Sequence, residues 1–188
     1  MIQIEAPLGE KDVLLHACCA PCSSAIVECL LAIGVRPTLF FYNPNIFLNE
    51  EYNKRKAECI RHAQLFGLRF VDADYDHAGW LEAVSGLETE PERGARCLQC
   101  FKLRLTATAL FAVEHGFTVF ATTLASSRWK SLEQIQEAGE AAAATSPNLL
   151  FWAQNWRKGG LSERRNELVH TYQFYNQSYC GCEFSLNF

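Results

Sequence analysis

Short apolar runs alternate along the chain with longer segments in which apolar residues recur every three or four positions. The runs predict strands at residues 11–17, 35–42, 68–73, 117–124 and 149–152. The periodic segments predict helices at residues 21–33, 49–66, 76–85, 97–115, 131–145 and 162–175. This alternation indicates a mainly parallel sheet with helices on both faces. We therefore expect a Rossmann-like α/β fold, a three-layer α/β/α sandwich.

Length and composition fit one such domain. The chain has 188 residues, of which 49% are hydrophobic, so we expect a single domain over residues 1–188. Its last segment, residues 176–188, carries two cysteines without clear periodicity, and we expect this tail to fold back on the functional site. The sequence shows neither a basic leader nor an apolar run of about 20 residues. We therefore expect a cytoplasmic protein without a membrane partner.

The first predicted strand leads into the segment Cys18-Cys19-Ala20-Pro21-Cys22 and then into a helix. Pro21 suits the first helical turn, because its fixed φ is already helical and its missing N–H would have no partner there. Cys22 then lies where free backbone N–H groups and the helix dipole favour a thiolate. We therefore expect ionised sulfur atoms that bind metal at this turn.

Nine cysteines are an unusual number for a chain without a secretion signal, and they favour metal binding or thiol chemistry over a disulfide framework. Cys29 and Cys59 share helix faces with apolar residues, so we expect both in the core. The other seven fall into three groups and are candidate metal ligands: Cys18, Cys19, Cys22, Cys97, Cys100, Cys180 and Cys182.

Three kinds of thiol site are compatible with these cysteines. Four thiolates can hold a structural zinc ion or an iron–sulfur cluster, and Cys180 and Cys182 can instead form a redox pair. Seven thiols exceed the four that either metal centre uses, so two centres account for them better than one. An iron with an open coordination position would act as a Lewis acid. The spacing favours no particular division of the thiols between two centres.

Five motifs together resemble the epoxyqueuosine reductases of the QueH type, in order and with the expected spacing from about residue 12 to residue 184. They are Cys18-Cys19-Ala20-Pro21, Phe41-Tyr42-Asn43-Pro44-Asn45, the segment from Glu90 to Phe101, Thr122-Thr123-Leu124 and Tyr179-Cys180-Gly181-Cys182. The resemblance implies a nucleotide hydrolase-like, HUP-type fold, which tRNA thiolases share. It also implies removal of the epoxide oxygen from epoxyqueuosine at the wobble position of tRNA, giving queuosine.

The resemblance further implies a [4Fe-4S] cluster beside a second metal ion, expected to be iron, and an external electron donor. The seven cysteines would supply the ligands. Some relatives have Asp at the position of Cys22, so the second metal of this chain would have a thiolate where theirs has a carboxylate.

Candidate substrate contacts lie where predicted strands end, and in the loop before Cys97. Carboxyl ends of parallel strands share one sheet edge, where ligands bind in such folds. The candidates are Tyr42, Asn43, Asn45, Thr122, Thr123, Arg93 and Arg96. Arg93 and Arg96, with Arg104, would alternatively offset the charge of the thiolates. His16 is a candidate proton donor, although a buried strand favours a core role for it.

The net charge of −4 argues against general nucleic-acid affinity but leaves room for a local basic patch. One candidate RNA surface combines four basic residues with two tryptophans: Arg157, Lys158, Arg164, Arg165, Trp152 and Trp156. Its alternative is a solvated helix start beside core tryptophans. The basic run at residues 54–56 would contact phosphates or simply face solvent.

Two other functions remain as alternatives. An ATP-dependent tRNA thiolase would need a Gly-rich phosphate loop after the first strand, where this chain has the bulkier Cys-Cys-Ala-Pro. A zinc-stapled binding module would need only four of the thiols and no open coordination position.

Overall fold

The computed structural model describes residues 4–73 and 75–186. Its sheet has five strands, all parallel, in the order β3-β2-β1-β4-β5. The strands are β1 (Asp12–His16), β2 (Arg36–Phe41), β3 (Phe70–Asp72), β4 (Val119–Thr122) and β5 (Leu150–Phe151). The order reverses between β1 and β4, and such a switch point opens a ligand crevice at the carboxyl edge of a sheet.

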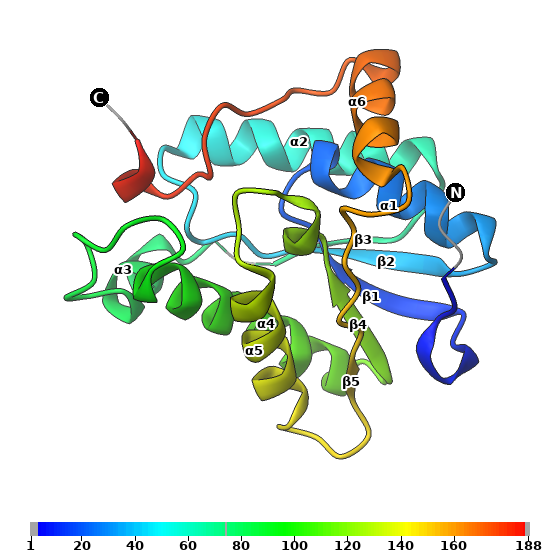
Figure 1. Cartoon of the computed structure of the whole chain (residues 1–188), viewed down its shortest axis with the longest axis horizontal. Helices are drawn as coiled ribbons and strands as arrows, with labels where there is room; N and C mark the ends of the chain where they lie inside the picture. The colour runs from blue at the N-terminus through cyan, green and yellow to red at the C-terminus, as the bar shows by residue number, and fades with distance from the viewer. Residues whose placement is uncertain (1–3, 74, 187–188) are drawn as a thin grey trace.

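Helices cover both faces of the sheet (Figure 1). One layer contains α1 (Ala20–Ala32), α2 (Asn49–Leu65) and α6 (Leu161–Tyr172). The other contains α3 (His77–Ala83), α4 (Ala95–Glu114) and α5 (Leu132–Ala143). Three short 3₁₀ helices complete the described elements: η1 (Pro7–Gly9), η2 (Thr123–Ser126) and η3 (Glu183–Ser185). The predicted three-layer α/β/α sandwich is confirmed.

The central strand β1 forms the middle of the core. Val13, Leu14 and Leu15 are fully buried, because the strand has neighbours on both edges and helices on both faces. Cys29 and Cys59 also lie in the core, as their helical spacing predicted. Among residues 4–73 and 75–186, no helix combines the length and the apolar character that crossing a bilayer requires.

Several helix boundaries differ from the sequence prediction by one to three residues, and two of them affect the site. Helix α4 begins at Ala95 rather than Cys97, because Gly94 adopts the extended N-cap conformation, and Arg96 therefore lies in the first helical turn. Helix α6 ends at Tyr172 rather than near residue 175, because Gln173 takes a left-handed conformation with φ of 50°. The chain turns there and enters the C-terminal tail.

A buried histidine joins the two helices α1 and α2. His62 is fully buried, and its Nδ1 lies 3.1 Å from the Ser23 hydroxyl. The rings of Phe66 and Phe174 meet it edge-on. Burial, together with the neighbouring charge of Arg61, lowers the pKa of His62 from 6.5 to about 4. The folded protein therefore holds this imidazole neutral.

This pKa shift makes stability depend on pH. The unfolded chain binds a proton at His62 more readily than the folded chain, so its contribution is complete above pH 6.5 and is lost as pH falls toward 4. Between pH 7 and pH 5, we expect the free energy of unfolding of the wild type to fall by about 2 kcal/mol more than that of His62→Phe. Urea unfolding at both pH values measures the difference. The prediction is contradicted if the free energy of unfolding falls by the same amount between pH 7 and pH 5 in the two proteins.

Candidate metal and substrate site

Three thiols meet at the turn between β1 and α1. The sulfur atoms of Cys18, Cys19 and Cys22 all lie within 4.8 Å of one another. Cys19 is the extended N-cap of α1, and Pro21 occupies the first helical turn as predicted. The three cysteines are buried, so this turn presents a compact set of soft donor atoms.

The three thiols do not titrate alike. Hydrogen bonds from Cys19 and Cys22 lower the pKa of Cys18 well below its usual range. Burial raises the pKa of Cys19, and the interaction with Cys18 raises that of Cys22 to about 11. The prediction that all of these sulfur atoms are ionised is therefore wrong for the protein alone. Burial at Cys19 and the interaction with Cys18 at Cys22 both disfavour the thiolate.

Polar groups behind the turn fix its position. Thr123 Oγ1 accepts a hydrogen bond from the Cys18 amide at 3.0 Å and lies 3.3 Å from its sulfur. His16 Nδ1 lies 2.8 Å from the Thr122 hydroxyl, and its Nε2 lies 3.1 Å from the Tyr42 carbonyl. Burial lowers the pKa of His16 to about 3. The structure thus places His16 as a neutral side chain inside the core.

A second group of thiols surrounds a neighbouring recess of about 30 Å³. Cys97 and Cys100 lie one turn apart on α4, and Cys180 and Cys182 come from the C-terminal tail. Burial raises the pKa of Cys97, and it raises that of Cys182 to about 11; nearby thiols of the same group add to both shifts. Two segments that are far apart in the sequence therefore place four cysteines on the wall of one small recess.

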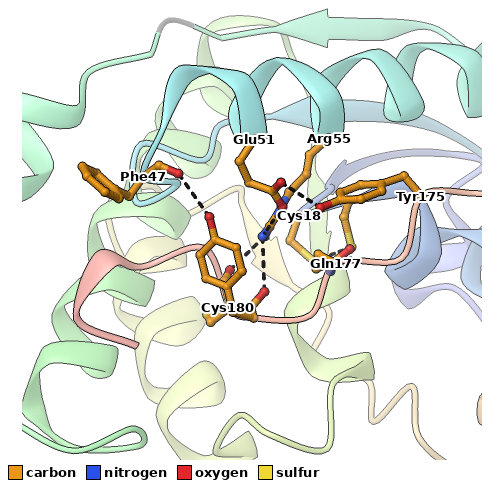
Figure 2. A network of polar contacts seen from close by, with 9 residues as sticks. Cys18, Phe47, Glu51, Arg55, Tyr175, Gln177 and Cys180 are labelled. Atoms are coloured by element: carbon orange, nitrogen blue, oxygen red, sulfur yellow. Dashed lines mark hydrogen bonds and ion pairs between the residues drawn. The ribbon is translucent and has the colours of Figure 1, made fainter. Parts of the chain in front are cut away.

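Arg55 holds the tail over the site (Figure 2). Its guanidinium donates hydrogen bonds to the carbonyls of Cys180 at 3.0 Å and Tyr179 at 3.2 Å. Glu51 accepts from Arg55 Nε at 2.7 Å and from the Tyr175 hydroxyl at 2.8 Å. The other residues in this network are Tyr175, Tyr179 and Cys180, and all three lie in the segment after α6.

A glutamine links the tail to the first thiol group. Gln177 Nε2 donates to the Cys19 sulfur at 2.9 Å (Figure 2). Residues 175–182 thus contact α2 through Arg55 and the β1–α1 turn through Cys19. The last two residues of the predicted tail, 187 and 188, lie outside the described part of the chain.

Three cations approach these thiols without a carboxylate partner. Arg96 is buried and donates to the carbonyls of Leu87, Glu88 and Glu90. Arg104 is buried too, contacts the Asn43 side chain and lies 3.9 Å from the Cys100 sulfur. The half-buried Lys130 is the third. Within the described ranges, none of the three cations forms an ion pair with Asp or Glu.

These cations indicate a site prepared for negative charge. Burial disfavours the charged form of Lys130, but the thiols of Cys180, Cys18 and Cys22 raise its pKa above the usual value. A buried guanidinium without an anion is costly. Thiolates, or an anionic group that they hold, offset this cost. The charge-offsetting role expected for Arg96 and Arg104 thus agrees with their positions.

A larger cavity of about 920 Å³ adjoins the recess, and Cys180, Lys130 and Arg96 line both spaces. Its wall also includes Cys18 and Cys22. Four of the predicted substrate contacts line one or both spaces: Asn43, Asn45, Arg93 and Arg96. The other three stand outside both walls and support the end of β1: Tyr42, Thr122 and Thr123.

The six residues of the candidate RNA surface differ in burial and in their contacts. Trp152 and Trp156 are buried against each other, so the core reading of these tryptophans is correct. Arg164 binds Glu28 and Glu167 at 2.7 Å each, which occupies its guanidinium. Arg157 donates to the Lys130 carbonyl at 2.7 Å, and Lys158 is exposed. Of the four basic residues, Arg165 lines the larger cavity.

Within the basic run at residues 54–56, Arg55 is buried. Lys56 pairs with Asp72 at 3.1 Å, and Lys54 lies over the Tyr175 ring. Lys130 and Gln177 were missed by the sequence analysis, because both lie in irregular segments whose position only the fold determines.

Comparison with known proteins identifies the family. The family model described as epoxyqueuosine reductase QueH matches residues 13–187. The chain belongs to the QueH family. Three curated relatives, each named epoxyqueuosine reductase QueH, illustrate the similarity. The Haemophilus influenzae protein is 47% identical over 98% of this chain and 75% of its own length. The Acinetobacter baylyi protein is 46% identical over 98% of this chain and 85% of its own length.

The Thermotoga maritima relative is 35% identical over 93% of this chain and 90% of its own length. The resemblance read from the five motifs is therefore confirmed. The buried triad of Cys18, Cys19 and Cys22 is compatible with metal binding in this QueH chain. Both thiol groups and both spaces lie within the matched residues.

We expect the hydrogen bonds of Arg55 to limit the solvent accessibility of the two cysteines in the C-terminal tail. Removing Arg55 alone would leave Glu51 unpaired and cost about 3–5 kcal/mol, so the sharper variant is Arg55→Met combined with Glu51→Gln. In the folded, metal-free double variant, we expect Cys180 and Cys182 to be alkylated at least about tenfold faster, because each lost hydrogen bond to a charged donor is worth about 1.5 kcal/mol or more.

Peptide mapping by mass spectrometry measures the alkylation rates, and circular dichroism checks that the variant is folded. The matched control is Lys56→Met, the next residue, whose exposed ion pair with Asp72 contributes about 0–1 kcal/mol. Unchanged alkylation of both tail cysteines in the double variant would show that other contacts hold the tail.

Proposed function

We propose that this protein is an epoxyqueuosine reductase that acts on tRNA carrying epoxyqueuosine at the wobble position. The reaction takes two electrons and two protons, breaks both C–O bonds of the epoxide, and yields the alkene of queuosine and one water. Family membership supports this proposal. The observation that carries it is the pair of thiol groups beside a cavity of about 920 Å³, a volume suited to a nucleoside-sized ligand.

We further propose that the second thiol group binds a [4Fe-4S] cluster. The four candidate ligands match the usual ligand number of such clusters: Cys97, Cys100, Cys180 and Cys182. Their recess of about 30 Å³ is far smaller than the roughly 300–1,000 Å³ of pockets that bind organic ligands, so a nucleoside would not occupy it. The cations Arg96 and Arg104, which form no ion pair with a described Asp or Glu, fit the negative charge that four thiolates bring.

We assign a second metal ion, expected to be iron, to Cys18, Cys19 and Cys22. Three sulfur atoms within 4.8 Å of one another supply three ligands and leave a coordination position for substrate. When bound, the cluster supplies electrons singly and the second metal polarises the epoxide oxygen. An external electron donor completes the proposed reaction.

The chain's own residues would bind the substrate and move protons. Asn45 lines the cavity, and its Oδ1 has no hydrogen-bond partner among the described residues, so this amide is available to the nucleoside. The Asn43 amide is instead held by the Ala17 carbonyl and by Arg104. Lys130 lines both spaces, and we propose that its ammonium group donates a proton to the oxygen that leaves as water. His16 is unsuited to this role, because it is neutral, buried and outside the cavity wall.

Direct assay tests the proposed reaction. Anaerobically prepared, iron-replete protein is incubated with a reductant and tRNA that contains epoxyqueuosine, and the nucleosides are analysed by liquid chromatography and mass spectrometry. We expect conversion to queuosine, and we expect Cys97→Ser to lose it. Cys29→Ala, which changes a core cysteine, serves as the control. If the iron-replete wild type forms no queuosine, the proposed function is wrong.

Metal analysis tests the division of the ligands. We expect Cys180→Ser to lose acid-labile sulfide and about four iron atoms per chain, whereas Cys22→Ser should keep the sulfide and lose about one iron. Iron and sulfide are measured on protein purified without air, with Cys29→Ala as control. Zinc without sulfide in the wild type would instead favour a zinc-stapled binding module. Loss of sulfide in Cys22→Ser would contradict the division proposed here.

A further inference from the structure

One tryptophan differs from the other three in its surroundings. Trp129 is 63% exposed, whereas Trp80, Trp152 and Trp156 are at most 7% exposed. It lies between η2 and α5 and lines both the thiol recess and the larger cavity. An indole ring that is exposed at the rim of a site, rather than packed in a core, is suited to contact a ligand.

The backbone around Trp129 is held in place. Arg93 donates hydrogen bonds to the carbonyls of Trp129 at 3.1 Å and Arg128 at 2.7 Å. Arg93 itself has a φ of 67°, an uncommon conformation for a residue other than glycine, and Gln134 donates to its carbonyl at 2.8 Å. Arg157 donates to the Lys130 carbonyl at 2.7 Å. The exposed ring therefore belongs to a turn whose backbone is held by hydrogen bonds.

The charge around the ring suits a polyanion. The Arg128 guanidinium lies 4.7 Å from the centre of the Trp129 ring. Six basic side chains and two carboxylates, Glu90 and Glu92, line the larger cavity. Glu51 neutralises one of the six, Arg55, which still leaves an excess of positive charge in a protein of net charge −4. Positive charge beside an exposed aromatic ring is typical of surfaces that bind single-stranded RNA.

We propose that Trp129 is a stacking platform for an anticodon-loop base next to the modified nucleotide. This inference rests on the proposed function, because the reacting nucleoside must enter the cavity to reach Cys18 and Cys22. Its neighbours in the RNA then remain at the rim, where Trp129 and Arg128 are exposed. Stacking is independent of base identity, so one platform serves tRNAs whose neighbouring bases differ.

Binding measurements test the platform. Metal-loaded wild type, Trp129→Ala and Trp129→Phe are titrated without reductant against tRNA containing epoxyqueuosine, at one fixed salt concentration. We expect Trp129→Ala to weaken affinity by about 5- to 150-fold, the range for removing an aromatic ring from a stacked base, and Trp129→Phe to retain most of it. Leu110→Ala, which removes an exposed side chain on α4 away from both cavities, should change affinity by less than about twofold.

Two further readouts separate stacking from a structural effect. In steady-state assays with tRNA, Trp129→Ala should raise KM with little change in kcat. Bound tRNA should also protect the wild-type fluorescence from acrylamide, because Trp129 is the exposed tryptophan, and Trp129→Phe should lose this protected component. Wild-type affinity of Trp129→Ala, equal weakening by both substitutions, or absence of protection would each overturn the platform. Failure of the proposed function is distinct, because the wild type itself would then form no queuosine.

Discussion

The guanidinium of Arg55 connects parts of the site that share no element of secondary structure. Its side chain is buried on α2, between Glu51 on the same helix and the carbonyls of Tyr179 and Cys180 in the tail. The segment from Tyr175 to Cys182 has neither helix nor strand to hold it, so contacts with other segments fix its backbone. That segment carries two of the seven clustered thiols, so Arg55 helps to position the second thiol group, together with contacts such as the hydrogen bond from the Phe47 amide to the Gly181 carbonyl at 2.8 Å.

Charge balance imposes a second constraint on the same region. Arg96 and Arg104 have no carboxylate partner in residues 4–73 and 75–186, and the groups that raise the pKa of Lys130 are thiols. Burying such cations is unfavourable unless an anion accompanies them. The thiols alone supply this charge weakly, since burial raises the pKa of Cys19, Cys97 and Cys182. The polypeptide is thus arranged for more negative charge than its own thiols carry, which is what metal–thiolate centres add.

The sequence predicted the layered fold well, because strands and helices here have distinct hydrophobic periods and several end at turn residues. It also identified the thiols, because cysteine is rare and their spacing is distinctive. It did not identify Arg55, whose run of basic residues looks like a solvated helix face; the partners that bury it lie more than 120 positions away. Lys130 and Trp129 were missed for the same reason. Their role depends on which loops the sheet order brings together, and periodicity carries no information about that.

In the proposed function, the two spaces of the site take different ligands, one inorganic and one organic. Trp80 and Phe101 close the thiol recess with apolar surface, and a dry wall favours retention of a metal–sulfur group and tunes its potential. The larger cavity instead carries amides and cations suited to a polar nucleoside. Cys180 and Lys130 line both spaces, so a proposed ligand and a proposed proton donor stand where the two meet. In the proposed reaction, electrons and protons would reach a bound epoxide from the same wall, and the RNA that carries it would stay outside the recess.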